Sequence, residues 1–239
     1  MDLTAIEFEL NPQAKPQVLL VGQEHTPVII IDDVCLNTKP IQEFAIKHCS
    51  FSVNSNSFYP GIRDLLPKDY VIKLLTSFYR NLYQIYNIPS KLTLTPKDTF
   101  FSLLNTPEHE LQFLQRLPHF DTSRPFYFAV LHYLNEGPHG NTALFRHKPT
   151  QYERITDQRV DAYLASAEDF INKHGEPESK YFDGSGEHFE KIYEVEYKPN
   201  RLVIYPGNIL HSIMVNVEND IDGNPKTGRL TANIFIEFE

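Results

Sequence analysis

The chain has 239 residues, of which 41% are hydrophobic, and its net charge is −9. This length and composition allow a sizeable buried core, and they predict a single domain over residues 1–239 rather than two complete domains. Because the net charge is negative and the Lys and Arg residues are scattered along the chain, we do not expect nucleic acid to be a partner.

The beginning of the chain shows neither a basic region nor a long apolar run, so we expect no signal peptide. No stretch approaches the length that spans a membrane, so no membrane partner is expected either. The two cysteines, Cys35 and Cys49, lack the spacing of a zinc site or of a disulfide framework. Together these features predict a cytoplasmic protein.

The amino-terminal part, residues 1–90, is predicted to supply strands and supporting helices. Strands are expected over 17–22 and 27–32, the second of which contains a Val-Ile-Ile-Ile run. A short helix is expected over 40–49, and Pro67 suits the first turn of a second helix. The apolar stripe of that second helix is Val71, Leu75, Phe78, Leu82 and Ile85. We expect both helices to pack outside one sheet.

Residues 91–239 are predicted to form the β-rich core. An apolar run over 126–135, bounded by turns, indicates a buried strand, and a second short strand is expected over 140–145. Strand alternation returns over 189–197 and continues to residue 238. The exception is a helix predicted over 157–174, where Val160, Leu164, Ala167 and Ile171 recur at helical spacing before Gly175.

Two connections within this core attract interest. The glycine-rich stretch 183–187 is consistent with a mobile lid, although an ordinary loop is the simpler interpretation. Residues 210–217 and 229–238 are predicted to be strands joined by 218–228, and we expect them to form an antiparallel hairpin centred near Asp222.

His119 and Asp121 are the first candidate site residues. In a strand, residues two apart share a face, so both side chains can reach one cation. Neutral imidazole and carboxylate suit a first-row metal, and a site with three such protein ligands leaves coordination positions open for chemistry. On its own the His-x-Asp tripeptide is weak evidence for a metal site, because a chain with ten histidines can contain it by chance.

The order of the motifs resembles the Fe(II)/2-oxoglutarate-dependent oxygenases, and within them the prolyl-hydroxylase-like branch. That family shows His-x-Asp, a strand ending in Tyr-Leu-Asn, a Gly-rich turn into a further strand, a Pro-Gly turn before a distal His, and finally Arg or Lys. The corresponding residues here are, in order, His119, Asp121, 133–135, 140–142, 206–207, His211 and Arg229. The resemblance covers residues 90–239 well and the amino-terminal third loosely. The chain is also similar to a bacterial subgroup of uncharacterised members whose genes often lie near tryptophan halogenases.

The resemblance implies that His119, Asp121 and His211 ligate Fe(II) and are the catalytic residues. It also implies 2-oxoglutarate and O2 as co-substrates, with ascorbate as a reductant. Arg229 would then bind the distal carboxylate of 2-oxoglutarate, since a planar guanidinium matches a carboxylate bidentately. Thr231, two residues further on, shares the face of the arginine and can add a hydroxyl donor. The spacing from His211 to Arg229 is longer than is usual in the family.

The keto-acid end of 2-oxoglutarate has three candidate partners. Tyr127, Tyr133 and Asn135 lie on the predicted core strands near the metal, where a phenol or an amide could hold it. The sequence does not decide between them.

The implied fold is mainly β with flanking helices (α+β), a double-stranded β-helix or jelly-roll of two sheets with helices outside one sheet. The implied activity is hydroxylation of a C–H bond in a small-molecule or peptidyl substrate, while desaturation and cyclisation stay open. Two alternatives also stay open: a cupin-like metalloenzyme that uses no 2-oxoglutarate, and a non-catalytic binding barrel. Arg229 discriminates the oxygenase from the cupin-like enzyme, which needs no carboxylate-binding arginine, and its presence beside all three ligand types speaks against the non-catalytic barrel.

Overall fold

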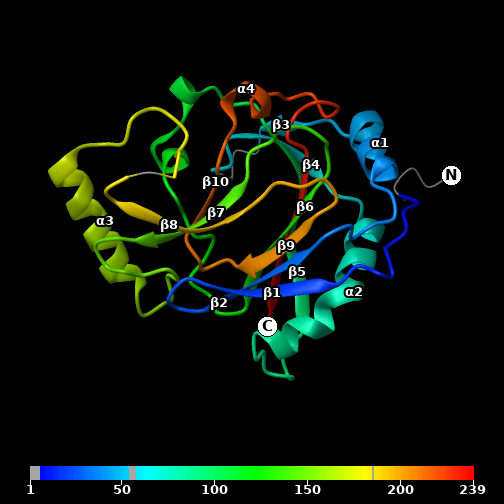
Figure 1. Cartoon of the computed structure of the whole chain (residues 1–239), viewed down its shortest axis with the longest axis horizontal. Coiled ribbons are helices and arrows are strands. Elements are labelled where there is room, and N and C mark those ends of the chain that lie inside the picture. The colour runs from blue at the N-terminus through cyan, green and yellow to red at the C-terminus, as the bar shows by residue number, and fades with distance from the viewer. Residues whose placement is uncertain (1–5, 54–57, 185) are drawn as a thin grey trace.

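The structure is a computed structural model that describes residues 6–53, 58–184 and 186–239 (Figure 1). Over these residues it consists mainly of antiparallel strands with a few helices. The strands are β1 (Pro16–Val21), β2 (Thr26–Ile31), β3 (Ser52–Val53), β4 (Gly61–Leu65), β5 (Leu94–Leu104), β6 (Tyr127–Tyr133), β7 (Thr142–His147), β8 (Phe189–Val195), β9 (Leu202–Pro206), β10 (His211–Ile213) and β11 (Thr231–Phe238). The helices are α1 (Lys39–His48), α2 (Lys68–Ile85), α3 (Val160–His174) and α4 (Val217–Asp220), with the 3-10 helices η1 (Glu108–Glu110) and η2 (Phe113–Arg116).

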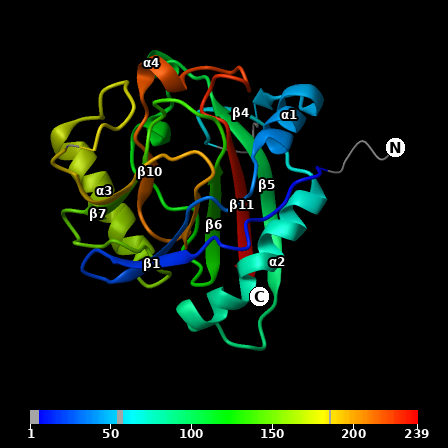
Figure 2. The ribbon, with the colours of Figure 1, turned by 45° about the vertical axis from the view of Figure 1, so that its right-hand side comes forward.

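The described strands form two sheets. Eight of them pair in the order β1-β2-β9-β6-β11-β5-β4-β3, and three pair in the order β10-β7-β8. Figures 1 and 2 show α1 and α2 at one side of the molecule, beside the large sheet, and α3 at the opposite side. None of the helices in the described ranges is long and apolar enough to cross a lipid bilayer.

Strand β11 shows how the large sheet separates a core from a cavity. Ala232, Ile234 and Ile236 point into a hydrophobic cluster that includes the buried residues of α1 and α2. Thr231 and Asn233, which alternate with them, point to the opposite face and line a cavity. The two-residue period of the strand thus gives each face its own composition.

Helix α2 covers the apolar face of the large sheet. It begins after Pro67, whose φ of −61° suits the start of a helix and which has no backbone N–H to leave unsatisfied. The predicted stripe is confirmed for four of its five members, which are buried: Val71, Leu75, Phe78 and Leu82. Ile85 is partly buried against the same cluster.

Helix α3 packs on the outside of the small sheet, through Tyr163 and the partly buried Val160. Along α3, which is fully described, Tyr163 is the only buried residue. The helix predicted over 157–174 is confirmed, and it ends at Gly175 as expected, but Leu164 of its apolar stripe is 53% exposed. The following stretch 183–187 is a loop in which Ser185 lies outside the described residues, so its role as a lid stays a prediction.

The predicted hairpin of 210–217 with 229–238 is also wrong. Strand β10 has three residues and pairs with β7 in the small sheet, whereas β11 pairs with β5 and β6 in the large sheet. The chain between them forms α4, which ends at the buried Asp220. The carboxylate of Asp220 accepts the backbone N–H of Asn216, and this contact favours a helical turn where a continuing strand was expected.

We expect Leu74→Ala in α2 to destabilise the fold by about 2–5 kcal/mol, because Leu74 is fully buried and the change leaves a cavity. Ile72→Ala in the same helix is the matched control, since Ile72 is 64% exposed and should change stability by less than about 0.5 kcal/mol. Urea unfolding followed by far-UV circular dichroism measures both. Equal losses from the two variants would contradict the orientation of α2.

Candidate metal centre

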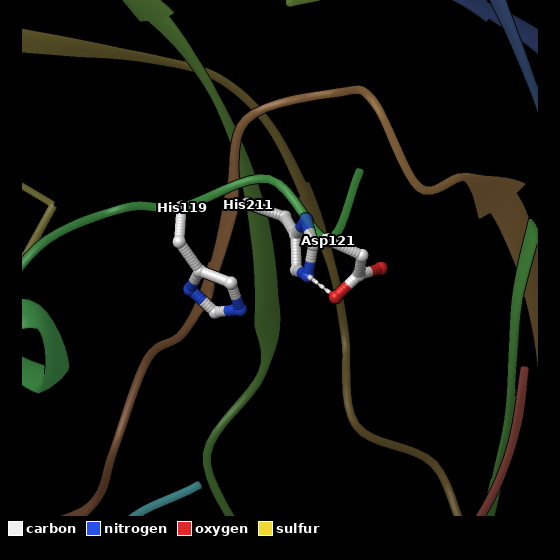
Figure 3. A group of neighbouring side chains, drawn as sticks. All are labelled: His119, Asp121 and His211. Atoms are coloured by element: carbon white, nitrogen blue, oxygen red, sulfur yellow. Dashed lines mark ion pairs between the residues drawn. The ribbon is translucent and has the colours of Figure 1, made fainter. Parts of the chain in front are cut away.

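Three side chains predicted to ligate a metal converge in the structure. One nitrogen or oxygen from each of His119, Asp121 and His211 lies within 4.8 Å of the others. Figure 3 shows the three side chains pointing toward one another, with His119 and Asp121 on one segment and His211 on another. Nε2 of His211 lies 3.8 Å from Oδ1 of Asp121. In the described part of the chain, no other group of three or more His, Cys, Asp or Glu meets this geometry.

Backbone hydrogen bonds fix the two segments to each other. The N–H of His119 donates to the carbonyl of His211 at 2.9 Å, and the N–H of His211 donates to the carbonyl of His119 at 2.8 Å. The N–H of Asp121 donates to the carbonyl of Gly207 at 2.7 Å. His119 thus lies in an isolated bridge rather than in a continuous strand. The predicted convergence of His119 and Asp121 nevertheless holds.

Gly207 makes the approach of the Asp121 segment possible. A Cβ atom at this position would lie 2.7 Å from Cδ1 of Tyr127 and 3.2 Å from Oδ2 of Asp121. Any larger residue would push the carboxylate away from the two histidines. The Pro-Gly motif found in the sequence therefore has a steric role beside the site.

The tautomer of His211 is set by its backbone contact. Nδ1 of His211 lies 2.9 Å from the carbonyl oxygen of Ile209. Since a carbonyl can only accept, Nδ1 carries the proton, and the lone pair of Nε2 faces Asp121. The ring of His119 is held by a backbone hydrogen bond to Leu117. Both imidazoles are thus oriented as a metal site requires.

Burial controls the charges at this centre. It lowers the pKa of His119 and of His211 to about 4, and it raises the pKa of Asp121 to about 6. The charges of His119 and Arg63 oppose the rise in the pKa of Asp121. At pH 7 the histidines are therefore neutral and Asp121 is ionised, which is the state that binds a metal.

The three side chains open on a cavity of about 1190 Å³. Its floor is the face of the large sheet that points away from α1 and α2, and it includes Phe100, Leu131, Thr231, Asn233 and Phe235. His211 is buried, whereas His119 and Asp121 keep surface accessible from the cavity. A ligand in the cavity can therefore reach the candidate metal position.

Arg229 lines the same cavity and is 2% exposed. Its Nε donates to the carbonyl of Gly140 at 2.8 Å, and its guanidinium carbon lies 5.5 and 5.3 Å from the ring centroids of Tyr133 and Tyr197. Its buried Nη2 has no hydrogen-bond partner among the described residues. Because a buried donor without an acceptor costs about 1–3 kcal/mol, this atom suits an anionic ligand.

Asp220 holds the acceptor of Arg229 in place. The carboxylate of Asp220 accepts the backbone N–H of Gly140 at 3.0 Å and bonds Nδ1 of His139 at 3.0 Å. A Cβ at Gly140 would lie 1.9 Å from the carbonyl oxygen of Met214, so glycine is required there. Sequence reasoning missed Asp220, because the segment that contains it was taken for a hairpin loop.

The other predicted cofactor residues take different places. Thr231 and Tyr127 line the cavity. The hydroxyl of Tyr133 donates to Oγ1 of Thr142 at 2.8 Å, and its ring packs beside Arg229. The amide nitrogen of Asn135 donates to the carbonyls of Pro225 and Gly228, at 3.0 and 2.9 Å. Asn135 therefore holds the loop that leads to Arg229 and is not part of the cavity wall.

Arg63 is a cavity residue that the sequence did not single out. It lies in β4, within a region where no strand was predicted. Its guanidinium carbon lies 4.1 Å from the ring centroid of Tyr59 and 5.4 Å from that of Phe100. Arg63 thus brings a second positive charge to the cavity that holds Arg229.

The fold and the centre define a mainly antiparallel β protein with a His-Asp-His group at a cavity. The chain belongs to the family described as "Family of unknown function (DUF6445)", whose model matches residues 12–236. The search of curated proteins gave no significant match.

Solved structures show weak similarity. One is an N-substituted L-amino acid dioxygenase from Burkholderia ambifaria AMMD, with 12% identity, a TM-score of 0.38, and coverage of 95% of this chain and 94% of that chain. Another is an N-substituted L-amino acid dioxygenase from the same organism in complex with alpha-KG, with 14% identity, a TM-score of 0.37 and coverage of 94% of each chain. At these TM-scores neither similarity carries a conclusion about this chain.

We expect the affinity of the protein for Fe(II) to fall as the pH drops through about 6, the pKa of Asp121. A protonated carboxyl is a poor ligand, so the loss should approach tenfold per pH unit below about 6, while the affinity above about 7 stays nearly constant. Anaerobic titration between pH 5 and 8 measures it. Asp121→Asn should weaken binding at every pH and remove this dependence. A midpoint near the usual Asp pKa of about 4 would contradict the effect of burial.

Proposed function

We propose that this protein is an Fe(II)/2-oxoglutarate-dependent dioxygenase that hydroxylates a C–H bond of a small-molecule or peptidyl substrate. One observation carries the proposal: a His-Asp-His group and a buried arginine with an unsatisfied N–H open on the same cavity. The first suits a metal with open coordination positions, and the second suits a carboxylate. 2-Oxoglutarate needs both.

His119, Asp121 and His211 would hold the iron. When Fe(II), 2-oxoglutarate and O2 are bound, they supply the oxidising chemistry, with ascorbate as a reductant that keeps the metal ferrous. The protein contributes two neutral imidazoles and one carboxylate in fixed positions. Because three protein ligands leave coordination positions open, a co-substrate and O2 can both bind.

Arg229 and Thr231 would bind the distal carboxylate of 2-oxoglutarate. Nε of Arg229 already donates to the carbonyl of Gly140, whereas the buried Nη2 has no partner among the described residues and can donate to a ligand. Thr231 is buried and also lines the cavity, where its hydroxyl can add a second donor. The phenol of Tyr127 is on the cavity wall as well, and it is our candidate for the keto-acid end.

The architecture supports the same proposal. Two antiparallel sheets enclose part of the hydrophobic core between them, and the helices α1 and α2 pack outside the larger one. Two packed antiparallel sheets are what a double-stranded β-helix requires. The expectation of helices outside one sheet only is corrected by α3, which packs outside the smaller sheet. Enclosure by two sheets would also shield the metal from bulk water.

We expect anaerobic addition of Fe(II) and 2-oxoglutarate to the purified protein to produce a weak visible charge-transfer band. His119→Ala should abolish the band because it removes a ligand. Arg229→Ala should weaken 2-oxoglutarate binding by about 10- to 100-fold, since it removes a charge-assisted contact, while leaving Fe(II) affinity within about twofold. Arg80→Ala is the matched control, because Arg80 is exposed on α2 and does not line the cavity.

The outcomes of this titration separate the alternatives. Fe(II) binding without the band, together with unchanged 2-oxoglutarate affinity in Arg229→Ala, would contradict the proposal and favour a cupin-like metalloenzyme. Absence of Fe(II) binding would favour a non-catalytic barrel. A positive result leads to a substrate screen by succinate release.

We expect Asp220→Asn to weaken 2-oxoglutarate binding by about tenfold without changing Fe(II) affinity. The amide keeps the shape of the carboxylate but cannot accept at both atoms, so Gly140 and hence Arg229 lose their fixed positions. Glu218→Gln is the control, because Glu218 is exposed on the same helix. Titration with Fe(II) and with 2-oxoglutarate measures the two affinities separately. An unchanged affinity for 2-oxoglutarate would show that Asp220 does not position Arg229.

A further inference from the structure

Part of the apolar face of α3 lines the cavity. Leu164, Ala167 and Ile171 line it together with the buried Tyr163, while Val160 packs against the core beside the small sheet. Leu164 is exposed, whereas Ala167 and Ile171 are partly buried. Apolar side chains along a cavity wall suit a ligand.

Two other apolar side chains stand at the same cavity. Leu114 of η2 is 49% exposed, and Phe58 is 63% exposed. A hydrogen bond of 3.1 Å from Nε2 of Gln115 to the carbonyl of Phe58 joins their segments. We call Phe58, Leu114, Leu164 and Ile171 the apolar arm of the cavity. Large apolar side chains gathered at one opening mark a binding site more often than a structural need.

Arg63 supplies a positive charge close to the metal ligands. In the sheet, Arg63 of β4 is the register partner of Ser102 in β5, which pairs with Thr231 in β11. All three therefore share the cavity face, and Arg63 lies two strand spacings, or about 10 Å, from Thr231. Its charge also acts on His119 and Asp121. Three acidic residues line the cavity wall: Asp98 and Glu168, which are exposed to solvent, and the candidate metal ligand Asp121, whose charge acts on Arg63.

The two arginines differ in their surroundings. Arg229 is buried, and the Gly140 carbonyl and two tyrosine rings hold it. Arg63 is partly accessible, and it lies against Tyr59 and Phe100 on the side of His119 and Asp121. A co-substrate held at Arg229 would not occupy Arg63, whose accessible side could add an anionic ligand to the contacts that it already makes.

The volume of the cavity sets the size of that ligand. Pockets for drug-sized molecules measure about 300–1,000 Å³. The cavity here, of about 1190 Å³, is thus larger than a small dicarboxylic acid such as 2-oxoglutarate requires. The remaining space and its apolar wall favour a bulky second molecule over a small polar one.

We infer that the substrate is an amphipathic organic anion. Its anionic group, a carboxylate or a group of similar chemistry, binds Arg63, and its bulky aromatic or branched apolar body lies in the apolar arm. This inference rests on the proposed function, since it names the substrate class of the same site. It assigns Arg63 to the substrate and Arg229 to the co-substrate.

A pair of fluorescent probes tests the inference without turnover. 1-Anilinonaphthalene-8-sulfonate and N-phenyl-1-naphthylamine share an apolar body, but the second lacks the anionic group. Titration of the purified protein, with Mn(II) and 2-oxoglutarate present and absent, should show both probes binding in the cavity. Arg63→Gln should weaken the sulfonate probe by about tenfold or more and change the neutral probe by less than about twofold.

Matched variants separate the two parts of the site. Arg63→Lys should restore part of the preference for the sulfonate probe, because it keeps the charge, and Arg80→Gln, at an exposed position of α2, should have no effect. Leu164→Glu should weaken both probes, whereas Ile72→Glu, at an exposed position of α2, should weaken neither. Equal affinities of the two probes, or equal losses in Arg63→Gln, would overturn the inference.

The same variants distinguish this inference from the proposed function. If the charge-transfer band fails to form but the probes behave as expected, the anion-binding cavity stands and the dioxygenase assignment fails. If the band forms and the probes show no dependence on Arg63, the dioxygenase assignment stands and the substrate class is wrong. As a check under turnover, aryl-alkanoic acids should stimulate succinate release more than their methyl esters, and Arg63→Gln should remove the difference.

Discussion

The reciprocal backbone hydrogen bonds between His119 and His211 are the contact on which the candidate centre depends. They join a segment that belongs to no continuous strand to β10, and β10 in turn pairs with β7. The bond from Asp121 to Gly207 fixes the third ligand in the same way. Because main-chain atoms make all these contacts, the positions of the side chains do not rely on a metal to gather them. A centre assembled before its metal arrives loses less entropy when the metal binds.

The two sheets contribute different parts of the cavity. The small sheet provides His211, while the large sheet provides the floor, with Thr231 and Arg63 in one register. Arg229 stands just before β11 and takes its orientation from Gly140, which precedes β7. Asp220 in turn fixes Gly140. The position of Arg229 therefore depends on how the two sheets are placed relative to each other. Any shift of one sheet against the other would move Arg229 relative to the metal ligands.

Local patterns in the sequence predicted what depends on local geometry. The spacing of His119 and Asp121 indicated a shared direction, and the stripe of α2 indicated the buried face of that helix. The prediction of a hairpin near Asp222 failed because Asp220 binds Gly140, 80 residues away. The pattern of residues close in sequence does not indicate a contact of this kind. The stripe of α3 indicated a helix correctly but not how far it is buried, because an apolar stripe looks the same whether or not a core covers it. Arg63 was missed because it lies in a strand that no pattern had predicted.

Strand β11 has a consequence for how insertions and deletions act on this protein. Thr231 and Asn233 face the cavity, and Ala232 and Ile234 face the helices. A slip of one residue would exchange the two sets, placing polar groups under α2 and aliphatic ones in the cavity. The core would then lose its apolar contacts at the same time as the cavity loses its polar wall. Errors in this register should therefore give unfolded chains rather than folded and inactive ones, so a chain that folds carries a correctly assembled cavity floor.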